Sequence, residues 1–134
     1  MCIRDRDYIN AHGTSTPSGD ISEIEAIAKA FGSEMPLISS TKSLTGHSLG
    51  AAGVHEIIYS LLMMKNNFLC GSHNIEELDP KAKLFPILKE NIEREINSFM
   101  SNSFGFGGTN GSIIIKKIYK GISSSIIGGF CSSI

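Results

Sequence analysis

The stretch DYINAHGTSTPSGDISEIEAIAKAFG (residues 7–32) joins an apolar segment to an amphipathic one through a loop rich in Gly, Ser and Thr. Asp7–Asn10 is typical of a short buried strand. Asp20 is a candidate helix N-cap, and a glutamate three residues later fits a capping box. The helix then ends at Gly32 and has one apolar face, formed by Ile21, Ile24, Ala28 and Phe31. A strand, a loop and a helix in this order predict an α/β domain.

The rest of the chain continues the alternation. Two β-rich segments, Ile96–Ser103 and Ser112–Ile118, flank the Gly-rich turn Gly105–Gly108 and predict a hairpin. Further elements are expected as a strand at Leu37–Ser40, a loop at Thr41–Ser48, a helix at about Gly50–Lys65, an extended segment at Phe68–His73 and irregular chain at Ile75–Glu90. The apolar side of the long helix comprises Ala51, Val54, Ile58, Leu61 and Leu62. The β-α-β-α-β-β order predicts a mixed sheet with covering helices.

The composition excludes several classes of protein. The 134 residues are 41% hydrophobic and 19% charged, with a formal net charge of −1, which disfavours nucleic acid or an anionic membrane as the main partner. Three cysteines without a close pair indicate neither a disulfide framework nor a zinc site, so no metal is expected. The longest apolar stretch, Val54–Met64, is too short to cross a bilayer. We expect a cytoplasmic protein with no membrane or nucleic-acid partner.

The two ends differ from the middle in composition. Residues 1–6 show no periodicity and resemble a cloning scar, so we expect a non-native leader. Residues 121–134, GISSSIIGGFCSSI, are rich in Gly, Ser and Ile. We expect them to form a tail of doubtful nativeness with little fixed structure, which leaves residues 7–120 as the domain.

Some motifs lack the context that their chemistry requires. In GFGGTNG, Asn110 stands where a dinucleotide-binding fingerprint needs its third glycine, and a hairpin follows in place of a helix. Ser39–Lys42 fits the Ser-x-x-Lys of penicillin-recognising enzymes, but their other two signatures are absent. GHSLG (Gly46–Gly50) fits the nucleophile elbow of α/β-hydrolases, but no acid followed by a histidine completes a triad.

Two histidines stand out because each lies in a polar loop at the end of a predicted strand. Binding and catalytic residues gather in such loops. His12 follows the first strand, and His47 precedes the long helix, five residues after Lys42. A helix N-terminus disfavours a protonated imidazole, so His47 is expected to stay neutral and to donate a hydrogen bond to a developing oxyanion.

Three segments together resemble the C-terminal signatures of β-ketoacyl-acyl-carrier-protein synthases. They are NAHGTSTPSGD (Asn10–Asp20), SSTKSLTGHSLGAAG (Ser39–Gly53) and SNSFGFGGTN (Ser101–Asn110), and they occur in the family's order. EIIYSLLM and NIEELDP lean toward the bacterial synthase I branch. The resemblance covers about Asp7–Lys120 and implies the C-terminal half of a thiolase-like fold, whose two similar halves pack around a five-layered core.

The resemblance also implies a reaction, a decarboxylative Claisen condensation. In the family, a cysteine of the N-terminal half carries the acyl chain, and malonyl-acyl-carrier-protein loses carbon dioxide to give the attacking enolate. By motif position His12 and His47 resemble the histidines that stabilise this enolate, and Lys42 resembles the active-site lysine. Glu23 resembles the acidic residue that would form an ion pair with Lys42.

Other implied roles concern the substrate arm and the acyl pocket. Thr14 and Thr16 resemble threonines that bind phosphopantetheine, and Phe106 resembles a gating phenylalanine, with Phe104, Gly105 and Gly107 in the same region. The implied partners are an acyl carrier protein and a second copy of the full-length enzyme. Substrates would be carried on phosphopantetheine, with no permanently bound cofactor.

Two alternatives remain open: a polyketide-type ketosynthase, and a non-catalytic partner similar to a chain-length factor. The chain by itself is expected to be inactive, because no cysteine lies in a nucleophile context. It is also expected to leave the surface around Ile58, Leu61 and Leu62 partly exposed.

Overall fold

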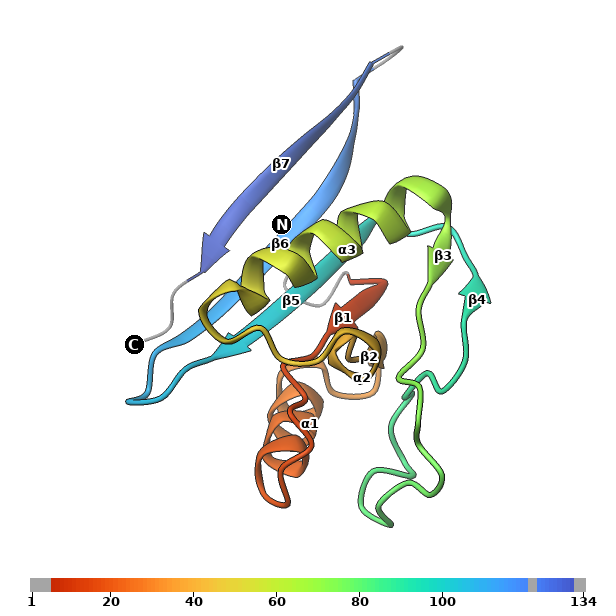
Figure 1. Cartoon of the computed structure of the whole chain (residues 1–134). Helices are drawn as coiled ribbons and strands as arrows, with labels where there is room; N and C mark the ends of the chain where they lie inside the picture. The colour runs from red at the N-terminus through yellow and green to blue at the C-terminus, as the bar shows by residue number, and fades with distance from the viewer. Residues whose placement is uncertain (1–5, 121–122, 132–134) are drawn as a thin grey trace.

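A five-stranded mixed sheet forms the centre of the computed structural model, which describes residues 6–120 and 123–131 (Figure 1). The strands follow the order β2-β1-β5-β6-β7. Strand β1 is parallel to both of its neighbours, whereas β5, β6 and β7 are antiparallel. Their bounds are Tyr8–Asn10 (β1), Leu37–Ser39 (β2), Ser98–Phe104 (β5), Asn110–Lys120 (β6) and Ser123–Cys131 (β7). The predicted mixed sheet and the hairpin are confirmed.

Helices α1 (Gly19–Phe31) and α3 (Ala52–Asn66) cover opposite faces of this sheet. Successive strand residues point to opposite faces, so each strand contributes to two cores. The core under α3 contains Tyr8, Phe99, Ile115, Met63, Met64, Leu69 and Ile96. The core under α1 contains Ile9, Met100, Ile114, Ala11, Ile27, Phe31 and Ile38. The result is a helix–sheet–helix layering.

The start of α1 differs from the prediction. Ser18, and not Asp20, occupies the N-cap position, and Asp20 lies in the first turn. Its Oδ1 accepts hydrogen bonds from the backbone N–H groups of Ser15 (3.1 Å) and Thr16 (3.4 Å). The Asp20 carboxylate therefore hydrogen-bonds the loop before the helix and does not serve as the N-cap. The helix ends at Gly32, as predicted, where φ is 66°.

Shorter elements complete the chain. The predicted loop at Thr41–Ser48 contains the short helix α2 (Lys42–Thr45), and a 3₁₀ turn η1 (Leu49–Ala51) precedes α3. Strands β3 (Phe68–Leu69) and β4 (Ile92–Glu93) form a separate two-stranded sheet. The intervening chain is irregular, as expected, and hydrogen-bonds to Ile38 through Pro86 and Leu88, which covers the β2 edge.

The buried side of α3 differs from its apolar side. Ala52, Glu56, Ser60, Met63 and Met64 are buried. By contrast, Val54, Ile58 and Leu62 are 60%, 47% and 49% exposed, and Leu61 is half-buried. The sheet-facing side carries two polar residues, because these belong to the network described below. Exposure of Ile58 and Leu62 agrees with the expectation for this surface.

The expectation of little fixed structure at the C-terminal end was wrong for Ser123–Cys131, which form β7 and pair with β6 over its length. Of the expected leader, residues 1–5 lie outside the described residues, whereas Arg6 is buried. Within the described part of the chain, no helix has the length and apolar character needed to cross a membrane.

Candidate active site

The two loop histidines meet where β1 and β2 end. His12 lies two residues after β1, and His47 lies between α2 and η1. Their ring centroids are 5.4 Å apart and their planes are nearly perpendicular, at 86°. Phe104, at the end of β5, packs edge-on against His12 with its centroid at 5.6 Å. Three aromatic rings from distant parts of the sequence thus lie in contact around His12.

His12 is held in its neutral form. Partial burial, together with the positive charge of Lys42 and the nearby His47, lowers the pKa of His12 from 6.5 to about 4. Its Nδ1 atom is buried and has no hydrogen-bond partner in the described part of the chain. A neutral imidazole carries one N–H, so it can donate a hydrogen bond without adding a positive charge. His47, in contrast, is exposed.

Glu23 does not pair with Lys42, and this prediction was wrong. Its carboxylate instead accepts hydrogen bonds from the backbone N–H groups of His12 (2.9 Å) and Gly13 (3.0 Å). It also accepts one from Asn102 Nδ2 (3.0 Å), on β5. A buried carboxylate needs donors, and the loop after β1 presents two of its own. Glu23 therefore fixes the backbone that carries His12.

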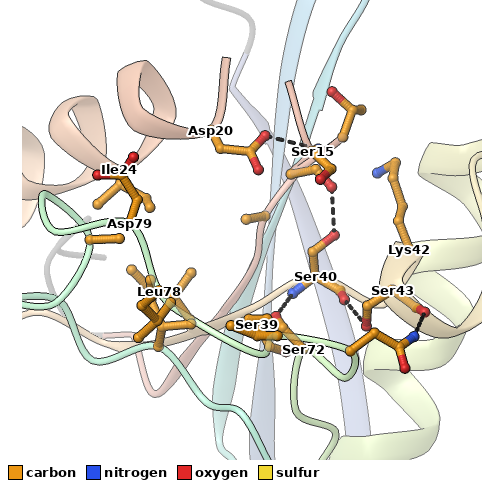
Figure 2. A pocket seen from close by; sticks show the side chains of 18 of the residues that line it. Ser15, Asp20, Ile24, Ser39, Ser40, Lys42, Ser43, Ser72, Leu78 and Asp79 are labelled. Carbon is orange, nitrogen blue, oxygen red and sulfur yellow. Dashed lines mark hydrogen bonds between the residues drawn. The ribbon is translucent and has the colours of Figure 1, made fainter. Parts of the chain in front are cut away.

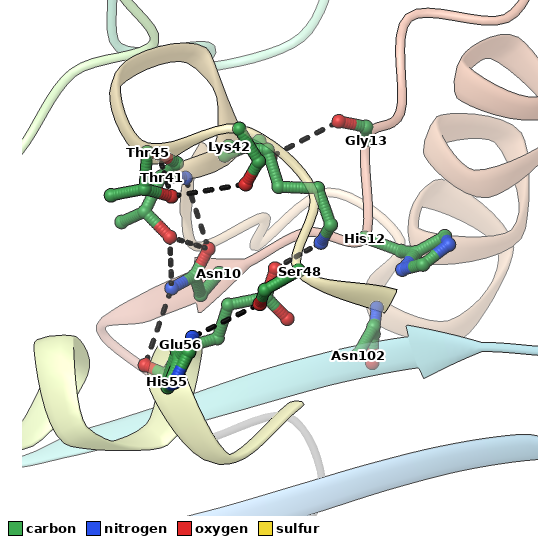
Figure 3. Close-up of polar contacts among 12 residues, drawn as sticks. Asn10, His12, Gly13, Thr41, Lys42, Thr45, Ser48, His55, Glu56 and Asn102 are labelled. Atoms are coloured by element: carbon green, nitrogen blue, oxygen red, sulfur yellow. Dashed lines mark hydrogen bonds and ion pairs between the residues drawn. The ribbon is translucent and has the colours of Figure 1, made fainter. Parts of the chain in front are cut away.

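Lys42 forms its ion pair with Glu56 of α3. The two side chains are only 5% and 3% exposed. Burial raises the pKa of the Glu56 carboxyl, and the hydrogen bond and charge of Lys42 oppose that shift. The ion pair holds the ammonium group of Lys42 near His12, where its charge acts on the imidazole (Figure 3).

Sequence reasoning missed Glu56, Asn10 and Asn102 as members of this network. The sequence analysis assigns no role to Glu56 and treats Asn10 only as the end of a strand and the start of a motif. Asn102 hydrogen-bonds both Glu23 and the Ser112 hydroxyl, which donates to its Oδ1 at 2.8 Å. The signal available for Asn10 and Asn102 is a polar residue inside a predicted strand. No such signal marks Glu56, which lies away from the apolar side of its helix.

A cavity of about 910 Å³ opens beside the ion pair (Figure 2). Of the predicted site residues, it is lined by Thr14, Glu23, Lys42 and His47. Thr14 is half-buried and Thr16 is exposed. Both lie in the loop that Asp20 holds through backbone hydrogen bonds to Ser15 and Thr16. Other walls come from α1 and from the irregular chain after β3.

The glycine-rich turn between β5 and β6 exposes its aromatic residue. Phe106 is fully exposed, and Phe104 is 37% exposed. Gly107 and Gly108 have φ values of 81° and 85°, which favour glycine, and the Gly105 N–H donates to Thr109 O at 2.7 Å. The structure thus brings Phe104 to His12 and presents Phe106 to solvent at the tip of the turn.

The described residues contain no group of three or more His, Cys, Asp or Glu side chains arranged to hold a metal ion.

The sequence matches a known protein family. The family model of the β-ketoacyl synthase C-terminal domain matches residues 3–76, which is more than half of the chain. The chain belongs to the β-ketoacyl synthase family.

Similar proteins agree with this assignment. The chain is 56% identical over 112 residues to 3-oxoacyl-[acyl-carrier-protein] synthase 1 of Escherichia coli strain K12, covering 84% of the chain and 28% of that protein. It is 47% identical to synthase 2 of Coxiella burnetii over 115 residues, covering 84% of the chain and 28% of the relative. This β-ketoacyl synthase segment therefore spans little more than a quarter of the length of these relatives.

Solved structures show the same fold. A β-ketoacyl synthase from Burkholderia phymatum STM815 superposes with a TM-score of 0.79 at 41% identity, covering 85% of the chain and 28% of that protein. A chain from the complex of a type II polyketide acyl carrier protein with its ketosynthase superposes with a TM-score of 0.78 at 32% identity, covering 83% of this chain and 28% of that chain. The predicted fold class, a thiolase-like C-terminal half, is confirmed.

Proposed function

We propose that this segment is the C-terminal part of a longer 3-oxoacyl-acyl-carrier-protein synthase. The observation that carries the proposal is the packing of two histidines, one of them kept neutral, beside the buried Lys42–Glu56 pair. Identity to curated synthases of that name supports it. Residues 7–120 would form the C-terminal domain of that enzyme.

The reaction joins an acyl thioester on a cysteine to a malonyl thioester. The bond between the malonyl carboxylate and its α-carbon breaks, carbon dioxide leaves, and the electron pair becomes an enolate. The enolate carbon attacks the acyl thioester carbonyl, and the cysteine leaves as a thiolate. We place this cysteine outside the chain. Cys70 is half-buried, and burial raises the pKa of its thiol, which is the opposite of activation.

His12 and His47 would stabilise the enolate. Each can donate a hydrogen bond to the malonyl thioester oxygen, on which negative charge develops only in the transition state. A neutral donor suits this role because it keeps its proton while the charge forms and disappears. Lys42, fixed by Glu56, would add a positive charge beside them, and Glu23 would hold the His12 backbone.

The remaining predicted residues would handle the substrate. Thr14 and Thr16 lie on the loop beside the cavity and would hydrogen-bond the phosphopantetheine arm. Phe106, at the exposed tip of a glycine-rich turn, would gate the acyl cysteine, with Phe104 in contact with His12. Gly105 and Gly107 would give this turn its mobility.

The substrate arm implies an acyl carrier protein as partner, as found for the polyketide ketosynthase above. No permanently bound cofactor is needed, since both acyl groups arrive as thioesters. A homodimer of the full-length enzyme and a cytoplasmic location complete the proposal. A role in fatty-acid elongation is favoured over a polyketide role, because identity is 56% to a synthase 1 but 31% to a ketosynthase/chain length factor.

A chimera tests the proposal. The matching 112 residues of Escherichia coli synthase 1 are replaced by those of this chain, and condensation of acyl and malonyl carrier proteins is measured. We expect the chimera to turn over and the 134-residue chain alone to show none. A soluble chimera without condensation, or turnover by the isolated chain, would contradict the proposal.

A further inference from the structure

The side chain of Asn10 joins three elements of the fold. Asn10 is fully buried at the end of β1. Its Nδ2 lies within hydrogen-bond distance of Ser60 Oγ (3.2 Å), Thr41 Oγ1 (3.3 Å) and the Glu56 carbonyl oxygen (3.4 Å). Its Oδ1 accepts from the Thr41 backbone N–H at 3.3 Å. One amide group thus contacts the chain after β2 and two consecutive turns of α3 (Figure 3).

Ser60 completes this junction from the helix side. It is fully buried in α3, where a hydroxyl needs hydrogen-bond partners. Its Oγ donates to the Glu56 carbonyl oxygen at 2.8 Å and accepts from Asn10 Nδ2. A serine bonded to the carbonyl four residues earlier is common in helices, but such a bond leaves its acceptor capacity unused. Here Asn10 uses it.

Each element at the junction carries one group of the proposed site. His12 follows Asn10 by two residues, Lys42 follows Thr41 by one, and Glu56 is itself a contact. A shift of any of the three elements would separate the ammonium group of Lys42 from the imidazole of His12. Resting on the proposed function, we propose that Asn10 and Ser60 are positioning residues that hold His12 and the Lys42–Glu56 pair in register for malonyl decarboxylation.

A purely structural role predicts a different outcome from a positioning role. Loss of a buried hydrogen bond lowers stability wherever it occurs. Misplacement of reacting groups by about 1 Å also slows the chemical step, by up to about 100-fold. Acyl transfer to the cysteine forms no enolate, so a positioning role slows decarboxylation and leaves acyl transfer nearly unchanged. The ratio of the two rates therefore separates the roles.

The test uses the full-length synthase that contains this chain. Asn10→Ala removes every contact at once and risks misfolding, so Ser60→Ala and the near-isosteric Thr41→Val are the informative variants. Thr41→Val keeps the backbone bond to Asn10 Oδ1. Ser98→Ala is the matched control: Ser98 is also buried, and its hydroxyl donates to Asp7, at the opposite end of β1 from Asn10.

We expect Ser60→Ala and Thr41→Val to slow malonyl decarboxylation by about 10- to 100-fold while acyl transfer changes by less than about threefold. Ser98→Ala should lower the melting temperature similarly and leave both rates near wild type. If Ser60→Ala and Ser98→Ala decarboxylate at the same rate, whether both are near wild type or both are slowed, the inference is overturned. A wild-type enzyme without condensation would instead overturn the proposed function.

Discussion

The pairing of Lys42 with Glu56, and not with Glu23, has a measurable consequence. Glu56→Gln removes the negative charge and leaves the Lys42 ammonium group buried with only an amide oxygen beside it. Both side chains are at most 5% exposed, so solvent offers little compensation. Breaking one partner of such a pair costs about 3–5 kcal/mol in the free energy of unfolding. Thermal denaturation of the chimera measures this loss as a lower melting temperature.

A double-mutant cycle then identifies the partner of Lys42. Lys42→Met combined with Glu56→Leu replaces the pair by apolar groups and should recover most of the loss of either single variant. Lys42→Met combined with Glu23→Gln should give additive losses within about 0.5 kcal/mol, since Glu23 bonds other donors. Additive losses with Glu56, or strong interaction with Glu23, would refute the assignment.

Three further predictions concern single residues. The His12 imidazole should titrate near pH 4 by NMR, and titration near 6.5 would contradict this. Because the pKa is lower in the folded protein than the value of about 6.5 in the unfolded chain, the stability that neutral His12 contributes is complete above pH 6.5 and falls as the pH drops toward 4. Phe106→Ala should leave the melting temperature unchanged, since the ring is fully exposed, but should alter acylation relative to condensation; unchanged rates of both steps would argue against a gate. Gly71→Ala should destabilise the fold by about 1–3 kcal/mol because its Cβ would lie 2.5 Å from the Glu90 nitrogen, whereas Gly50→Ala, with open space, should be neutral; equal melting temperatures would contradict the packing.

Much of the fold could be predicted because local patterns and tertiary structure agree. The strand Tyr8–Asn10, the helix ending at Gly32 and the hairpin of β5 and β6 each carry their own signals, such as a positive-φ glycine at a helix end. The face of α3 could not be predicted from hydrophobicity. Glu56 and Ser60 are buried because tertiary hydrogen bonds satisfy them, and no local pattern encodes those partners.

The candidate site divides in the same way. His12, His47 and Lys42 could be found because each lies in a polar loop at the end of a strand, and the fold brings the two histidines within 5.4 Å between ring centroids. The partner of Lys42 could not be identified from the sequence, because Glu23 and Glu56 are both acidic residues on helices next to the site. Only the packing of α3 against β5 and the loop after β2 decides which carboxylate reaches the ammonium group.

The most direct test of the central claim is the rate of malonyl decarboxylation by the chimera before and after His47→Ala. The account predicts a loss of about 100- to 1,000-fold, the usual effect of removing one oxyanion donor, while acyl transfer to the cysteine stays within about twofold of wild type. His12→Ala should behave in the same way. Decarboxylation at the wild-type rate in the His47→Ala chimera would contradict the claim that these histidines stabilise the enolate.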